Sequence, residues 1–293
     1  MQRSGRCTSA DGQRIMITIT SYRELMDFVI AFGQGHLNML VMCSRGGLGK
    51  SEAVQRELSD QDRVDIAGHE TPLDLYRKMY EGRDKLIVFD EIDELLAASA
   101  NVGLLKQICE TRTVKRVQWG STDKRAHEID GGIGHFHTRS RVCLLCNSFA
   151  LFNSNVAALK SRGLAVQFLP SSQEILDKIK TFAGDTDILQ FLDHFHECIP
   201  EFSLRTYRTL EDLKRAGLDW SRYAIAETNT PPKLMEIADL LCRFDTDVEC
   251  VKHYSGSRRD FYNWKPQAVE YLHRQSIRAL AQKARESQSQ DAA

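Results

Sequence analysis

The feature that most constrains the fold of this chain is an apolar run that leads directly into a glycine-rich segment. Residues 37–43 read LNMLVMC, and residues 44–51 read SRGGLGKS. A phosphate-binding loop joins a buried strand to a helix and follows the pattern G-x-x-x-x-G-K-[ST]. Ser44 occupies the first glycine position of that pattern, so the match is imperfect. The rest of the chain must therefore supply the partners that a bound nucleotide needs.

The glycine-rich segment contains the groups that a phosphate loop requires. Glycines let the backbone N–H groups approach an anion, the lysine reaches the outer phosphates, and the serine hydroxyl binds magnesium at the start of a helix. The alternative is a strand-to-helix turn with an incidental lysine. The expected nucleotide-binding residues are Gly46, Gly47, Leu48, Gly49, Lys50 and Ser51.

A second apolar run ends in two adjacent carboxylates. Residues 85–91 read KLIVFDE. In a parallel sheet the end of this strand lies beside the phosphate loop, where Asp90 can support magnesium and Glu91 can polarise an attacking water. The alternative interpretation treats both residues as acids at a helix N-terminus, because the sequence IDELLAAS follows. Together with the loop, the pair favours the magnesium interpretation.

Short apolar runs alternate with helical patterns over the first part of the chain. Runs of this length without polar alternation are typical of parallel strands buried on both faces. Strand and helix in alternation predict a layered α/β domain with right-handed crossovers. The five expected strands cover residues 37–43, 64–67, 86–89, 142–146 and 164–168.

Beyond Pro170 the pattern becomes helical, over residues 171–182, 188–198, 203–216 and 233–244. These spacings predict a small helical domain after the sheet. We expect an N-terminal extension at residues 1–19, the α/β core at 20–170, a helical lid at 171–245, and a helical extension with a polar tail at 246–293.

With the loop and the acidic pair in this order, the sequence resembles the AAA+ family of ATPases over about residues 20–245. The resemblance implies a three-layer α/β/α P-loop NTPase domain with a five-stranded parallel sheet, followed by a small α-helical lid domain. It also implies ATP and Mg2+ as cofactors, ATP hydrolysis, and assembly into a homo-oligomeric ring or filament. The chain departs from the family pattern at Ser44 and in the short spacing between the loop and Asp90.

The family places three further polar residues around its nucleotide. By position, Asn147 after the fourth strand matches the residue that orients water, although an asparagine there is often a turn residue. Arg162 matches the arginine that reaches a neighbouring subunit's nucleotide, with Lys160 as a weaker competitor and a helix C-terminal charge as the alternative. Arg205 matches the arginine of the lid, against a solvent-facing role, with Arg208 one turn on.

Residues 111–141 form a long segment with seven Lys or Arg against three Asp or Glu. Its VKRVQW stretch alternates like a strand, and a glycine-containing return predicts a hairpin. Basic residues with aromatics suit single-stranded nucleic acid, whereas the alternative is an exposed loop whose tryptophan packs on the core. The nucleic-acid candidates are Lys115, Arg116, Trp119, Lys124 and Arg125.

Composition sets broad limits on the chain. It has 293 residues, 42% of them hydrophobic, and a formal net charge of -1, so attraction to nucleic acid must come from local patches. The polar N-terminus and the lack of a long apolar stretch predict a cytoplasmic protein without a membrane segment. Cys143 and Cys146 form a C-x-x-C, but they lie in an expected strand without a second pair, which favours the core over ligation or redox chemistry.

These observations favour a DNA-directed ATPase motor or assembly factor of a replication system or a mobile genetic element. The alternative is a nucleotide-switched scaffold that acts on a protein partner and hydrolyses slowly, for which Ser44 is a mild argument. A protein-remodelling ATPase ranks last, because the stretch after residues 64–67 lacks the aromatic pore loop that such enzymes present.

Overall fold

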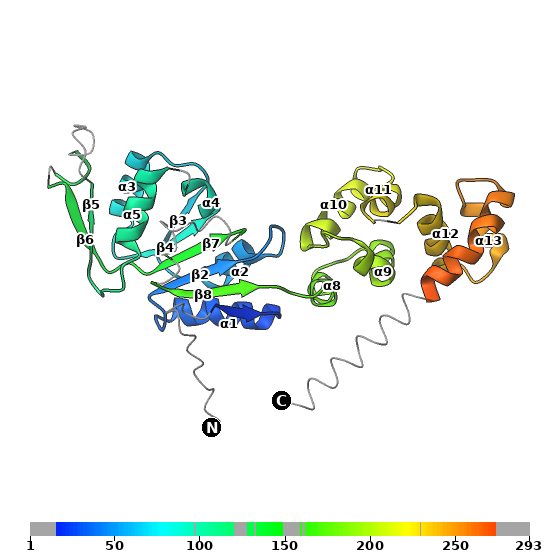
Figure 1. Cartoon of the computed structure of the whole chain (residues 1–293), viewed down its shortest axis with the longest axis horizontal. Helices are drawn as coiled ribbons and strands as arrows, with labels where there is room; N and C mark the ends of the chain where they lie inside the picture. Colours follow the sequence, from blue (N-terminus) through cyan, green and yellow to red (C-terminus); the bar gives the residue numbers. More distant parts are fainter. Residues whose placement is uncertain are drawn as a thin grey trace, which may run out of the picture. The chain divides into compact units, whose positions relative to one another are not determined.

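A computed structural model of the chain describes residues 16–96, 98–119, 128–131, 133–148, 159, 162–228 and 230–273. The chain divides into two units between Glu174 and Ile175 (Figure 1). The sequence placed the end of the sheet domain at residue 170. None of the helices in the described ranges is long and apolar enough to cross a membrane.

The first unit contains a parallel sheet of six strands in the order β1–β8–β2–β7–β4–β3. The strands are β1 (Ile17–Ile19), β2 (Met39–Cys43), β3 (Arg63–Ala67), β4 (Leu86–Asp90), β7 (Val142–Cys146) and β8 (Leu164–Phe168). All five predicted strands are present. The predicted number of strands was one too low, because the short edge strand β1 pairs with β8 through Ile17 and Val166.

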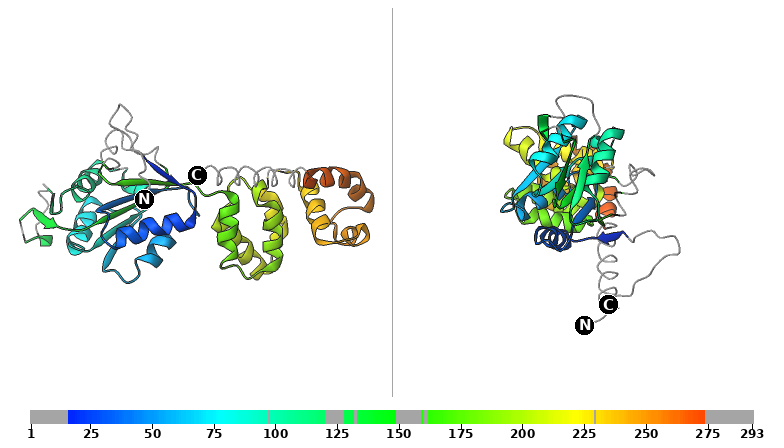
Figure 2. Two further views of the ribbon diagram at one scale, coloured as in Figure 1. Left: turned by 90° about the horizontal axis from the view of Figure 1, so that it is seen from below. Right: turned by 90° about the vertical axis from the view of Figure 1, so that its left-hand side faces the viewer.

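Helices cover both faces of this sheet (Figures 1 and 2). They are α1 (Tyr22–Gly33), α2 (Lys50–Glu57), α3 (Pro72–Glu81), α4 (Ile92–Leu95) and α5 (Ser99–Ile108). Right-handed crossovers place α1 and α2 on one face and α3 and α5 on the other. Met39, Val41 and Cys43 point into the same apolar cluster as Leu75 and Leu105 of α3 and α5, which agrees with that arrangement. The predicted three-layer α/β/α class is confirmed.

Local signals explain where α1 begins and which face it buries. The Ser21 side chain accepts a hydrogen bond from the Glu24 N–H group, and the Glu24 carboxylate accepts one from the Ser21 N–H group, which makes a capping box. Leu25, Val29 and Phe32 follow at helical spacing and are fully buried. The start of α1 and its buried face therefore follow from residues close together in the sequence.

A two-stranded antiparallel hairpin, β5 (Lys115–Gln118) with β6 (His135–Thr138), extends from the first unit and confirms the predicted hairpin. Its inner face packs on α3, where the Phe136 and Tyr76 rings lie 5.4 Å apart. The Tyr76 hydroxyl also donates a 2.7 Å hydrogen bond to the buried Asp130 carboxylate near the hairpin return. Among the described residues, the hairpin is therefore held to the core through this face.

Cys143 and Cys146 are fully buried in β7, which confirms that they belong to the core. Cys146 lies beside Cys43 of β2 in the strand register. None of the seven cysteines in the described ranges forms a disulfide. No group of three or more metal-ligating side chains occurs among the described residues, so a cysteine metal site has no support there.

The second unit is helical throughout its described part. Its elements are α8 (Ser172–Lys180), which begins in the first unit, α9 (Thr186–Phe195), the 3-10 turn η2 (His196–Cys198), α10 (Leu204–Arg215), α11 (Trp220–Glu227), α12 (Pro232–Arg243) and α13 (Asp247–His253). Residues 258–273 are helical as well. This agrees with the helical part that the sequence predicted after the sheet.

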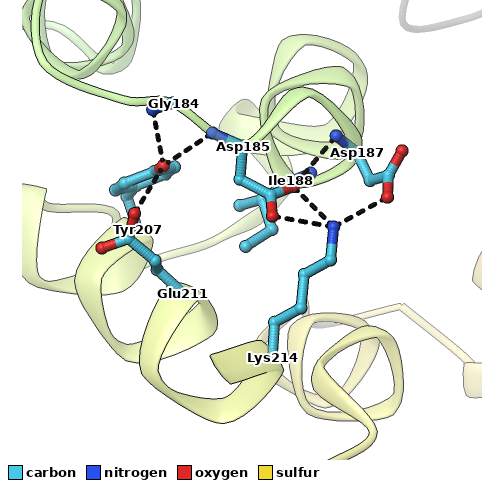
Figure 3. A network of polar contacts seen from close by, with 7 residues as sticks. All are labelled: Gly184, Asp185, Asp187, Ile188, Tyr207, Glu211 and Lys214. Atoms are coloured by element: carbon cyan, nitrogen blue, oxygen red, sulfur yellow. Dashed lines mark hydrogen bonds and ion pairs between the residues drawn. The ribbon is translucent and has the colours of Figure 1, made fainter. Parts of the chain in front are cut away.

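A polar network joins α9 to α10 (Figure 3). Lys214 lies 2.8 Å from Asp185 and 2.7 Å from Asp187. The Tyr207 hydroxyl oxygen accepts hydrogen bonds from the N–H groups of Gly184 and Asp185, at 3.1 and 3.2 Å. Burial alone would raise the pKa of Asp185, but the bonds from Lys214 and from backbone N–H groups hold it below its usual value. The network thus ties α10 to the start of α9 and to the turn that precedes it.

Candidate nucleotide site

The candidate site lies at the carboxyl edge of the sheet, where three neighbouring strands end. β7 pairs with β2 on one side and with β4 on the other. All three strands are parallel, so the segments that follow them lie side by side. This order places Asn147, after β7, between the glycine-rich loop after β2 and the acidic pair at the end of β4.

The backbone of the loop explains why Ser44 is compatible with it. Gly47 and Gly49 have φ values of 80° and 79°, in the left-handed region that favours glycine. Ser44 is not among the described residues with positive φ. Its N–H group donates to the Cys146 carbonyl at 3.2 Å and extends the pairing of β2 with β7. A side chain at this first position therefore causes no backbone strain.

Lys50 lies at the start of α2 and directs its ammonium group back into the loop. Its Nζ atom lies 2.5 Å from the Ser44 carbonyl oxygen, 3.0 Å from Ser44 Oγ and 3.2 Å from the Arg45 carbonyl oxygen. It also donates to Asn147 Oδ1 at 3.3 Å. The Ser44 hydroxyl is thus part of the lysine's surroundings, a contribution that the sequence pattern did not reveal.

Lys50 is a largely buried residue. Only 7% of the residue is exposed. Burial lowers the pKa of Lys50 below its usual value, while the nearby carboxylates of Asp90 and Asp93 oppose that shift. Phosphate oxygens placed near Nζ would add negative charge and stabilise the ammonium form further.

The remaining loop residues have the placement that a phosphate site requires. Leu48 is 2% exposed and anchors the loop in the core, so its contribution to a ligand would come from its backbone. Gly49 is the N-cap of α2, and Ser51 is the second residue of that helix. No side-chain hydrogen bond caps the helix start, which leaves its backbone donors directed toward the loop.

The acidic pair lies where β4 turns into α4. Asp90 is half-buried, and its Oδ1 atom accepts a hydrogen bond of 3.0 Å from the Glu91 N–H group. Glu91 is exposed and has φ 54° and ψ 44°, a left-handed conformation that is unfavourable for a glutamate. Strain of this kind is common at functional sites, where the surrounding structure holds the residue in place.

Asp93 belongs to the site, although the sequence analysis did not select it. Its Oδ2 atom accepts a 2.9 Å hydrogen bond from the backbone N–H group of Asn147. The spacing D-E-I-D shows that a third carboxylate follows the pair, but only the strand order reveals that it faces the end of β7.

The side chains expected to hold magnesium offer the oxygen donors that this ion prefers. Ser51 offers a hydroxyl and Asp90 a carboxylate, both at the carboxyl edge of the sheet. Magnesium prefers oxygen ligands and commonly uses one or two protein groups together with phosphate and water. The lack of a larger ligand cluster in the described ranges is compatible with that chemistry.

Two predicted arginines lie away from this edge or in the other unit. Arg162 precedes β8, at the amino edge of the sheet, and its guanidinium donates to the Lys106 carbonyl of α5. Arg205 is the second residue of α10 in the second unit, and its side chain is exposed. Their roles toward a nucleotide stay predictions.

The hairpin residues predicted to bind nucleic acid differ in exposure. The expectation for Lys115 is wrong, because its side chain is fully buried and its Nζ atom donates to the Ser140 carbonyl at 2.6 Å. Arg116 is exposed on the opposite face. Trp119 is half-buried, with its ring 5.5 Å from that of Tyr76. Lys124 and Arg125 lie outside the described residues.

Comparisons with known proteins place this fold among distant neighbours. A scan against models of protein families finds no match, and neither does a search of curated proteins. Among solved structures, a Thermotoga maritima RuvB Holliday junction branch migration motor has 17% identity and a TM-score of 0.42, over 68% of this chain and 65% of that one. NtrX from Brucella abortus in complex with ATP has 10% identity and a TM-score of 0.47, over 87% and 69% of the two chains.

A structure from work on katanin self-assembly has 15% identity and a TM-score of 0.40, over 85% of this chain and 82% of that one. This chain thus spans slightly less than two thirds of the RuvB chain that it matches. At these low TM-scores the likenesses carry none of the reasoning about function, which rests on the strands and side chains described above.

The strained backbone at Glu91 leads to a stability prediction. Glycine adopts a left-handed conformation without the cost of about 1–2 kcal/mol that other residues incur. We therefore expect the free energy of unfolding of Glu91→Gly to exceed that of Glu91→Ala by about 1 kcal/mol, measured by urea denaturation.

The control is the same pair of substitutions at Glu94, an exposed residue inside α4. There alanine should be the more stable choice, as in ordinary helices. The same order at both positions would contradict a strained Glu91.

Proposed function

We propose that this protein is an AAA+ ATPase that hydrolyses ATP with magnesium at the carboxyl edge of its sheet. The observation that carries the proposal is the bonded chain from Lys50 to Asn147 and from Asn147 to Asp93. It links the glycine-rich loop, the end of β7 and the acidic turn, which are the three parts that phosphoryl transfer to water requires.

In the proposed reaction the protein supplies positioning and charge. Backbone N–H groups around Gly47 and Gly49 bind the phosphates, and Lys50 binds their outer oxygens. Magnesium, held by Ser51 and Asp90, would neutralise charge on the β and γ phosphates when bound. Glu91 and the Asn147 amide orient the water that attacks the γ-phosphorus, and Glu91 accepts its proton. The bond to the bridging oxygen then breaks and leaves ADP and phosphate.

The partners belong to the same proposal. Arg162 would complete the site of a neighbouring copy in a homo-oligomeric ring or filament, and Arg205 would contact the γ-phosphate from the helical unit. We further propose a cytoplasmic location, in line with the absence of disulfides among the described cysteines.

For the target of the ATPase we favour DNA, because of the outward face of the hairpin. Arg116, Gln118, His135 and His137 share that face by the two-residue period of the strands. Arg116 and His137 are register partners, and both are exposed. A cation beside aromatic rings suits phosphate contact and base stacking. The alternative is a nucleotide-switched scaffold for a protein partner.

The hydrolysis proposal is tested by ATP turnover of the wild type beside Glu91→Gln. Loss of a general base lowers the rate by about 10²- to 10⁴-fold, so we expect the variant to retain ATP binding and lose most of its turnover. Equal turnover of both proteins would contradict the role of Glu91. Absence of turnover in the wild type would favour the scaffold.

The DNA proposal is tested by adding single- and double-stranded DNA to the same assay. We expect DNA to raise ATP turnover, and Arg116→Ala to weaken this effect with a smaller salt dependence, because one phosphate contact is lost. Arg215→Ala is the matched control, since this arginine is also exposed but lies in α10. ATP turnover that does not change when DNA is added would contradict the DNA proposal and favour a protein partner.

A further inference from the structure

Asp93 is a carboxylate of the acidic turn that bonds to the end of another strand. Its Oδ2 atom accepts the Asn147 N–H group at 2.9 Å. Its Oδ1 atom is buried and has no hydrogen-bond partner among the described residues. A bond from an N–H group to an ionised carboxylate is shorter and stronger than one between neutral groups. Asp93 therefore holds the main chain of Asn147 through one oxygen.

The strand pairing shows why such a bond is needed at this place. The pairing of β4 with β7 ends at Phe89 and Leu144. The pairing of β2 with β7 continues to Cys43 and Cys146. At its carboxyl end β7 is thus held to β2 by the ladder, while no ladder holds it to β4. The Asp93 bond connects β7 to the acidic turn beyond the last paired residues.

The bond also links the acidic turn to Lys50 through Asn147. The backbone N–H group of Asn147 donates to Asp93 at 2.9 Å, and the side-chain Oδ1 atom of Asn147 accepts from Lys50 at 3.3 Å. Asp93 and Asp90 both favour the charged form of Lys50, against the burial that lowers its pKa. Asn147, the residue that follows β7, is thereby held between the loop and the acidic turn.

We propose that Asp93 is a positioning residue that sets the separation of Asn147 from Glu91, and so the place of the attacking water. This inference rests on the proposed ATPase function. A water shared by two groups needs each of them within about 3 Å, so a small shift of the β7 end disrupts it. Nucleotide binding depends on the loop and Lys50, which remain tied to β7 through Ser44 and its bond to Cys146.

A purely structural role for Asp93 predicts different results. An acid near a helix start interacts with the helix dipole, but α4 has only four residues, so this effect is small. If Asp93 served stability alone, its removal would lower the melting temperature and leave the kinetics of the folded protein unchanged. A positioning residue instead changes kcat at a constant KM.

The experiment compares Asp93→Ala, Asp93→Asn and Glu94→Ala with the wild type and Glu91→Gln. ATP turnover and equilibrium binding of a fluorescent ATP analogue are measured for each protein. We expect Asp93→Ala to lower kcat by about 10- to 100-fold, with KM and analogue affinity within about twofold of wild type. Asp93→Asn keeps an acceptor oxygen and should recover part of the rate. Glu94→Ala, the control in the same helix, should match the wild type.

A second arm repeats Asp93→Ala in an Asn147→Ala background. If Asp93 acts through Asn147, adding Asp93→Ala to the Asn147→Ala variant should lower kcat by less than about twofold. Independent, multiplying losses would overturn the proposal, as would wild-type kcat in Asp93→Ala or a raised KM at constant kcat. If Asp93→Ala fails to fold by circular dichroism, Asp93→Asn decides by the same criteria.

The two levels of the proposal fail in different ways. A wild type without turnover overturns the ATPase function and this inference with it. A wild type that hydrolyses ATP and loses activity in Glu91→Gln, together with a fully active Asp93→Ala, overturns the inference alone.

Discussion

The rest of the site depends on the position of β7 between β2 and β4. Parallel pairing on both sides brings the ends of three strands together, although their residues are far apart in the sequence. Each strand end then contributes one kind of group: a glycine-rich loop with a lysine, an amide, and a pair of carboxylates. Local sequence provides each group, and the strand order brings the groups within bonding distance.

The resulting site is held by polar bonds in a buried setting. The Lys50 ammonium has four oxygen acceptors within 3.3 Å, which offsets the cost of removing its charge from water. Ser44 supplies two of them, its carbonyl oxygen and its hydroxyl. A serine in place of glycine at this position thus adds a hydroxyl acceptor to the loop without straining it. A bound phosphate would replace some of these acceptors with more strongly charged oxygens.

The sequence predicted the features that rest on local pattern. The buried strands, the loop, the acidic pair and the hairpin all follow from apolar runs and turn residues, and the structure contains them. The strand β1 has only three residues, too few for a clear periodic signal. The burial of Lys115 could have been foreseen, because it shares a strand face with Val117. Asp93 could not, since its partner is known only once β4 and β7 are neighbours.

The central claim is that the three strand ends form one nucleotide site. Isothermal titration calorimetry of magnesium ATP into the wild type and into Lys50→Ala tests it most directly, with Lys85→Ala as control, since Lys85 is half-buried and pairs with Asp62 away from the loop. The account predicts saturable binding to the wild type and the control, and an affinity lower by at least about tenfold in Lys50→Ala, because the charged contact to phosphate is lost. Equal binding by all three proteins, or none by the wild type, would contradict it.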